Sequence, residues 1–161
     1  MSARVVVAGI GNVFFGDDGF GVEVARRLAM RGLPPGVKVM DSGIRGLHLA
    51  FELLDGVDLL VAIDATPRGG APGSLYVIEP ELDGGAAEPD AHSMQLPAVL
   101  ATVRALGGAL PRVRVVGCEP AACEGIGLSD VVGAAVEPAV ELVRDWVARE
   151  LAAYGAAEVR R

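Results

Sequence analysis

Short strand-like runs rich in Val, Leu and Ile recur along the chain, and they constrain its fold more than any other feature. The run at residues 5–10 and most of the run at 58–63 are apolar throughout, as expected for strands that are covered on both faces of a sheet. Turn residues set the runs apart from their surroundings. We predict strands over residues 5–10, 37–40, 58–63, 75–78 and 113–117.

Segments with apolar residues at helical spacing separate most of these runs. We predict helices over residues 20–31, 46–54, 97–106 and 129–154. Ser129 is expected to cap the last of them, and Pro138 is expected to kink or split it. Alternation of strands and helices favours a parallel sheet with helices on both faces.

The predicted order of elements also locates a ligand site. Right-handed crossovers favour the spatial order 2-1-3 for the first three strands, so the winding reverses between strands one and three. Ligands of open α/β sheets bind at the carboxyl ends of the strands that flank such a switch. We therefore predict a doubly wound, mostly parallel five-stranded sheet in one domain, residues 1–154, with a frayed tail at 155–161 and a site beside the first strand.

Composition excludes several classes of function. The net charge is −7 and Lys38 is the only lysine, so the chain lacks the basic face that nucleic-acid binding requires. No apolar run approaches the roughly 18 residues of a membrane span, and the first residues show no secretion signal. The two cysteines are too few for a disulfide scaffold. We expect a cytoplasmic monomer with no nucleic-acid or membrane partner.

Residues 9–21, GIGNVFFGDDGFG, follow the first predicted strand and partly match a dinucleotide-binding fingerprint. The third glycine of that fingerprint would fall at position 14, which is Phe14. Asp17 and Asp18 would also repel a pyrophosphate at the start of the following helix. A cation is therefore a better ligand than a nucleotide, although either acid could instead cap the helix.

Two further residues join Asp18 as candidates. Asp64 follows five apolar residues at the carboxyl end of the third strand, next to the expected switch. His92 lies in a polar loop just before the helix that Pro97 introduces, whereas His48, the other histidine, falls within a short apolar helix. A divalent metal ion could be bound by Asp18, Asp64 and His92, with some of its coordination positions left open. Alternatively, the three side chains could act as general acids and bases without a metal. The usual nucleophile motifs are absent from the sequence.

Taken together, the motifs resemble those of the hydrogenase maturation endopeptidases, which trim the large subunits of nickel-iron hydrogenases. The matching segments are residues 9–21, Asp-Ser-Gly-x-x-Gly-Leu at 41–47, Ala-Ile-Asp-Ala at 62–65, Pro-Gly at 72–73, His-x-x-x-Leu at 92–96, Gly-x-x-Pro at 117–120 and Gly-Leu-Ser at 127–129. They span nearly the whole chain in the order found in the family. The resemblance implies a doubly wound sheet with an antiparallel edge strand.

The resemblance also implies a chemistry. Asp18, Asp64 and His92 would bind nickel that arrives with the hydrogenase large-subunit precursor, whose C-terminal extension is then removed. Asp17, or one of the three ligands, is a candidate proton acceptor. Residues 41–46 are a candidate lining of the cleft that holds the precursor tail. Two alternatives stay open: a metal-dependent hydrolase of a small substrate that uses the same Asp/Asp/His site, and a nonenzymatic nucleotide-binding or metallochaperone module.

Overall fold

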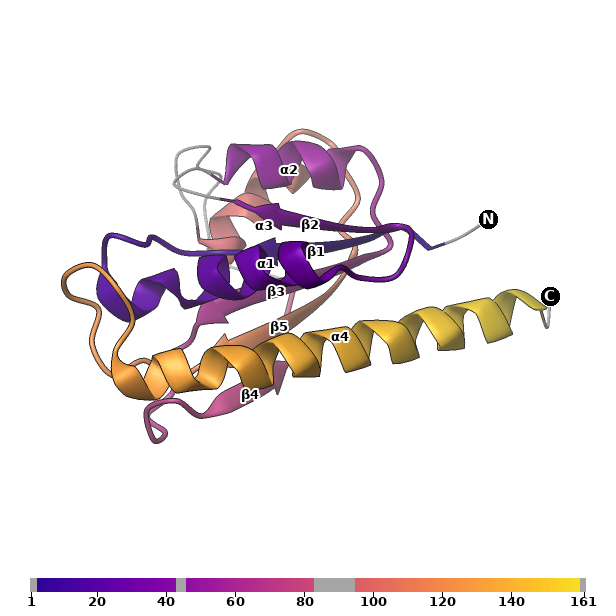
Figure 1. The fold of residues 1–161 in the computed structure, drawn as a ribbon. Helices are drawn as coiled ribbons and strands as arrows, with labels where there is room; N and C mark the ends of the chain where they lie inside the picture. Colours follow the sequence, from indigo (N-terminus) through magenta and orange to yellow (C-terminus); the bar gives the residue numbers. More distant parts are fainter. Residues whose placement is uncertain (1–2, 43–45, 83–94, 160–161) are drawn as a thin grey trace.

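The computed structural model describes residues 3–42, 46–82 and 95–159, with side chains described as far as residue 156. Five strands form one sheet in the order β2-β1-β3-β5-β4 (Figure 1). The strands are β1 (Val5–Gly9), β2 (Val37–Asp41), β3 (Leu59–Ala65), β4 (Leu75–Ile78) and β5 (Arg112–Cys118). All neighbours are parallel except β4, which is antiparallel to β5. The predicted fold class, the 2-1-3 order and the antiparallel edge strand are confirmed.

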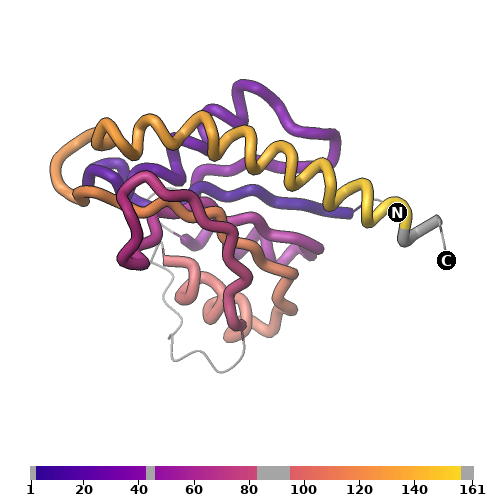
Figure 2. Tube along the Cα trace, turned by 90° about the horizontal axis from the view of Figure 1, so that it is seen from below, coloured from indigo at the N-terminus to yellow at the C-terminus, as the bar shows by residue number. Residues whose placement is uncertain are grey.

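Helices cover both faces of the sheet. They are α1 (Phe20–Arg31), α2 (Leu47–Leu54), α3 (Leu96–Ala105) and α4 (Asp130–Val159), with a short 3-10 helix, η1 (Gly16–Gly19), before α1. Figure 2 shows α4 along one side of the sheet and α3 on the other. Neighbouring residues of a strand point to opposite faces, so Val5 and Val7 of β1 pack with α1 and α4, whereas Val6 and Ala8 pack with α2 and α3.

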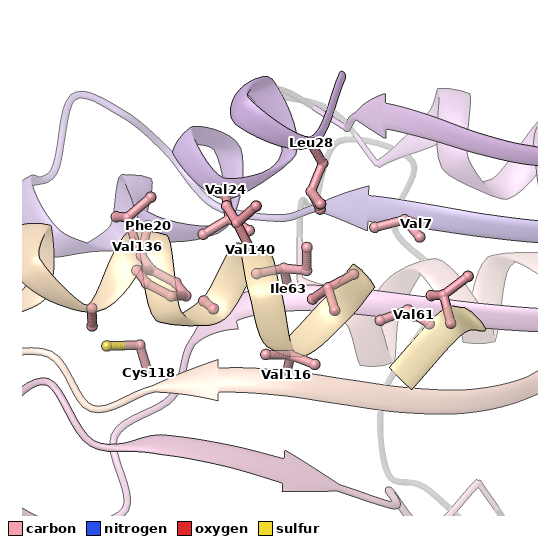
Figure 3. Close-up of a cluster of buried hydrophobic side chains, with 14 of the residues drawn as sticks. Val7, Phe20, Val24, Leu28, Val61, Ile63, Val116, Cys118, Val136 and Val140 are labelled. Atoms are coloured by element: carbon pink, nitrogen blue, oxygen red, sulfur yellow. The ribbon is translucent and has the colours of Figure 1, made fainter. Parts of the chain in front are cut away.

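The core between the sheet, α1 and α4 is the larger of the two apolar clusters (Figure 3). Phe20, Val24 and Leu28 recur at helical spacing along α1, and all three are fully buried. Gly21 lets α1 begin close to the sheet, because a Cβ built there would lie 2.0 Å from the carbonyl oxygen of Ile63. The start of α1, which follows Asp18, is therefore held against the carboxyl end of β3.

The C-terminal helix differs from its prediction. It was expected to end near Tyr154 and to kink or split at Pro138. The early end and the split are wrong, because α4 is one helix that continues to Val159, whereas the kink stays a prediction. Pro138 faces solvent, while the adjacent Ala139 and Val140 are fully buried. Packing of this buried stripe outweighs the roughly 3 kcal/mol that an interior proline costs a helix. Among the described residues, no helix is long and apolar enough to span a membrane.

Candidate functional site

A pocket of ≈720 Å³ lies at the carboxyl ends of β1 and β3, where the strand order switches. The parallel register pairs Gly9 with Ile63, so the residues that follow them, Ile10 and Asp64, reach the same edge of the sheet. The pocket is lined by Ile10, Gly11, Asn12, Phe15, Asp18, Asp64, Ala65, Pro67, Gln95, Leu96, Pro97, Pro120 and Cys123. The structure thus brings two of the predicted site residues together.

Asp18 is held at the pocket by the turn that follows β1. Its Oδ2 accepts a hydrogen bond of 2.8 Å from the backbone N–H of Asn12. Gly11 has a φ of +123°, and a Cβ there would lie 1.9 Å from the carbonyl oxygen of Asp18. Only glycine meets both conditions without rearrangement, so it sets the close approach of this turn to η1.

Asp64 is the last residue but one of the central strand β3, and its side chain is partly buried. Burial and the nearby charge of Asp18 raise the pKa of Asp64 to about 7, against the opposing effect of the Ala65 backbone N–H. Two carboxylates that share a poorly solvated site favour either a proton on one of them or a cation between them. The donor chemistry therefore fits a divalent metal ion.

A metal site built from this chain needs more than the pair. Among residues 3–42, 46–82 and 95–159, no group of three or more His, Cys, Asp or Glu side chains is arranged to hold a metal ion. His92 lies outside the described residues. Gln95, three positions after it in the sequence, lines the pocket. The third predicted ligand thus stays a prediction, while the chain that follows it reaches the site.

Asp17 has a different environment from its neighbour. It is fully buried, and its carboxylate accepts four hydrogen bonds from the segment before α4: from the N–H groups of Ala121, Ala122 and Ser129 and from the Ser129 hydroxyl, at 2.7–2.9 Å. Burial acts to raise the pKa of Asp17, but these hydrogen bonds outweigh it and lower the pKa. Asp17 does not line the pocket, so the structure does not bring this candidate proton acceptor to the pair.

Helix capping also proves to be the wrong explanation of these acids. Gly19 occupies the N-cap of α1, and no side chain donates or accepts a capping bond there. Ser129 directly precedes α4, where its carbonyl oxygen accepts from the N–H of Gly133, and its hydroxyl donates to Asp17; its side chain as the cap of that helix stays a prediction. Asp17 therefore joins two segments that are more than a hundred residues apart, whereas Asp18 is left facing the pocket.

Glu119 is a structural residue that the sequence patterns did not single out. It is buried just after β5, and its carboxylate accepts hydrogen bonds from the N–H groups of Arg68 and Gly70 and from the Tyr76 hydroxyl. Burial acts to raise its pKa, but the hydrogen bonds outweigh burial and lower it. The bonds fix the segment after Pro67, which lines the pocket. The rule that drew attention to Asp64, an acid at the end of a strand, would also have found Glu119.

Other candidates lie elsewhere. His48 is exposed on α2 and does not line the pocket. Asp41 ends β2 and Ser42 bonds to the carbonyl oxygen of Gly9, but neither lines the pocket, and residues 43–45 lie outside the described residues. A second pocket of ≈430 Å³ runs along α3 without either carboxylate of the pair. The acidic pocket at the switch is thus the site best supported by its chemistry.

Fold and pocket together define an α/β protein with a carboxylate pair at the topological switch of its sheet. A family model described as hydrogenase maturation protease matches residues 22–146. The chain therefore belongs to the hydrogenase maturation protease family, which confirms the resemblance seen in its motifs.

Individual relatives agree with this assignment. The chain is 33% identical over 156 residues to the hydrogenase expression/formation protein HupD of Rhodobacter capsulatus, a match that covers 94% of this chain and 73% of that protein. It is 31% identical over 146 residues to the hydrogenase 2 maturation protease of Escherichia coli, covering 87% and 88%. The solved structure of the hydrogenase maturating endopeptidase HybD from E. coli superposes with a TM-score of 0.75 at 29% identity, covering 91% and 93%. The chain is accordingly an endopeptidase of this family.

Proposed function

We propose that this endopeptidase removes the C-terminal extension of a nickel-loaded hydrogenase large-subunit precursor and recognises the nickel ion in the substrate. The observation that carries the proposal is the meeting of Asp18 and Asp64 in one pocket at the switch between β1 and β3. His92 is proposed as the third ligand. Family membership supports the class of substrate, because the named relatives are hydrogenase maturation proteases.

The ligand set suits an ion that arrives with the substrate. Two carboxylates and one imidazole leave coordination positions open, which groups of the precursor would occupy. These three side chains would recognise an ion that the precursor already coordinates in part, because neither the three side chains nor the precursor alone would complete the coordination shell of the nickel ion. A precursor without nickel lacks the bridge, so cleavage would depend on correct metal insertion.

The pocket residues would also manage a proton. Without a cation, the raised pKa of Asp64 leaves that carboxyl substantially protonated near neutral pH. Binding of the ion would favour the charged form and release this proton. The ion would polarise the scissile carbonyl or lower the pKa of a water molecule, while Asp18 and Asp64 orient it. Asp17 would act by holding the segment before α4 in place rather than by accepting a proton.

Purified nickel-loaded and nickel-free precursors, analysed by mass spectrometry of the large subunit, test the proposal. We expect the wild-type protein to shorten only the nickel-loaded precursor. Asp18→Asn, Asp64→Asn and His92→Ala should each abolish processing, whereas Asp145→Asn, at an exposed acid of α4, should leave it unchanged. Equal cutting of both precursors would remove nickel from the recognition step.

Metal analysis of the isolated protein separates this function from hydrolysis of a small substrate at the same pocket. A tightly held stoichiometric metal would favour the small-substrate hydrolase. A metal-poor protein that still processes the nickel-loaded precursor would favour the proposed function.

We also propose that the protein acts as a monomer in the cytoplasm. Cys118 and Cys123 are both free thiols, which agrees with a reducing compartment. Sedimentation of the purified protein would measure its oligomeric state directly, and a stable dimer would contradict the proposal.

A further inference from the structure

Exposed apolar side chains gather on two loops beside the acidic pocket. Phe14 and Phe15 are each 56% exposed, Val13 is 43% exposed and Ile126 is 83% exposed. We call these four residues the apolar rim. The other large apolar side chains that are exposed in the described part of the chain are not neighbours in the sequence, and the two on α4 lie near its opposite ends: Met30, Phe51, Val77, Leu106, Val131 and Tyr154. Scattered residues of that kind are normal on a protein surface, but a concentration on neighbouring loops indicates a contact surface.

Hydrogen bonds fasten the two loops of the rim to each other. The backbone N–H of Gly16 donates to the carbonyl oxygen of Gly125 at 2.6 Å, and that of Asp17 donates to Ala122 at 2.9 Å. The buried Asp17 carboxylate adds its four bonds to the same segment. The rim is thus carried by a fixed scaffold, and a partner that binds it would lose less free energy in ordering the loops.

The rim is continuous with the pocket. Phe15 both belongs to the rim and lines the pocket that contains Asp18 and Asp64. Cys123 lines the pocket from the same loop that carries Ile126. A ligand that extends out of the pocket on this side therefore meets the apolar rim next.

We propose that the apolar rim is the docking surface for the folded body of the hydrogenase large-subunit precursor, whose C-terminal segment enters the pocket; this inference rests on the proposed function. A stable complex of two folded proteins buries roughly 1,200–2,000 Å² in total, which exceeds what the walls of one pocket can supply. Aromatic side chains at such surfaces contribute most of the binding energy. Val13, Phe14, Phe15 and Ile126 supply that contact where the tail leaves the pocket.

A second copy of this chain fits the surface less well. The rim alone is too small for a stable dimer, so its partner must also place a segment in the pocket. The carboxyl end of α4 lies at the opposite end of the molecule from the two loops (Figures 1 and 2). A two-fold dimer that joins rim to rim would therefore keep both C-terminal ends away from both pockets.

The test uses Phe14→Ser combined with Ile126→Ser, because neither side chain lines the pocket. Met30→Ser with Leu106→Ser is the matched control, since it removes two exposed apolar side chains from α1 and from the end of α3. With nickel-loaded precursor as substrate, we expect the rim variant to raise KM by about tenfold or more and to leave kcat within about twofold. The control should match the wild-type protein in both constants, and all three proteins should unfold at the same temperature.

The outcomes separate the docking surface from the proposed function. If the wild-type protein processes the precursor and the rim variant does so with an unchanged KM, the docking surface is wrong and the function stands. If the wild-type protein cuts no precursor, the function fails, and calorimetric titration of the same precursor then decides the inference: equal affinity for the wild-type protein and the rim variant, or no binding to either, overturns it. Dimers that only the rim variant dissociates, at unchanged KM, would assign the rim to self-association instead.

Discussion

The carboxylate pair that lines the acidic pocket, Asp18 and Asp64, and the two buried carboxylates outside it, Asp17 and Glu119, use the same chemical group in opposite ways. In the pocket, burial and the charge of Asp18 raise the pKa of Asp64 to about 7. Asp17 and Glu119 do not line the pocket but lie next to Asp18 and Pro120 in the sequence; both are more deeply buried than Asp64, yet hydrogen bonds from several backbone N–H groups lower the pKa of each. Burial alone therefore does not distinguish a reactive carboxylate from a structural one. The number of donors that each carboxylate receives makes the distinction.

We expect substitutions in the pocket pair to reduce processing and substitutions of Asp17 or Glu119 to reduce stability. Substitution in the pair should have the largest effect. Asp64→Asn removes a charge that the ion requires, so processing of the nickel-loaded precursor should fall more than about a hundredfold. Stability should be preserved or slightly increased, because the repulsion with Asp18 is lost. Product formation and urea unfolding measured on the same sample check both halves. A destabilised Asp64→Asn protein would mean that Asp64 also stabilises the fold.

The same Asp-to-Asn substitution at the buried Asp17 should act mainly on the stability of the fold. Asp17→Asn turns an amide group toward N–H donors, and the free energy of unfolding should fall by about 1–3 kcal/mol. Asp130→Asn, at an exposed acid at the start of α4, is the control. Urea unfolding gives the values. An Asp17→Asn protein of full stability that has lost all processing would instead restore Asp17 as a proton acceptor.

Acid titration sharpens the same contrast at Glu119. Its pKa is lowered in the folded state, so its contribution to stability is present above the ordinary pKa of a glutamate and is lost as the pH falls through the lowered value. Glu119→Gln should therefore flatten the acid side of the stability profile, which unfolding experiments between about pH 7 and about pH 3 would measure. A variant whose stability falls with acid as steeply as that of the wild-type protein would contradict this role.

The smallest effect is expected for Cys123, which lines the pocket without belonging to the carboxylate pair. The residue as a whole is exposed, but partial desolvation of its sulfur at the pocket, together with the charges of Asp18 and Asp17, raises the pKa of the thiol, so the neutral form dominates near neutral pH. Cys123→Ser should change the rate of processing by no more than about twofold. A large loss of processing would place the sulfur among the groups that contact the ion or the precursor.

Local patterns were sufficient to predict most of the fold. Apolar runs and helical spacing placed the five strands and the start of each α-helix within about two residues, and α1 and β4 began and ended where predicted, whereas η1 was not predicted. The wrongly predicted split of α4 had a nonlocal cause, since buried residues on both sides of Pro138 keep the helix continuous. Asp64 was found because an acid at the end of a buried strand must lie at the edge of the sheet.

The sequence by itself determined the α/β alternation, the switch beside β1 and the acid at the end of β3, Asp64, because each follows from contacts within a strand, a helix or one crossover. Only the tertiary structure decided which of two adjacent acids faces the pocket. The Asp17 carboxylate accepts hydrogen bonds from N–H groups of a segment more than a hundred residues away, and no local sequence pattern predicts that pairing. Hydrogen-bond donors of a distant segment satisfy the carboxylate of Asp17, and the neighbouring carboxylate of Asp18 faces the pocket, where it could contact an ion.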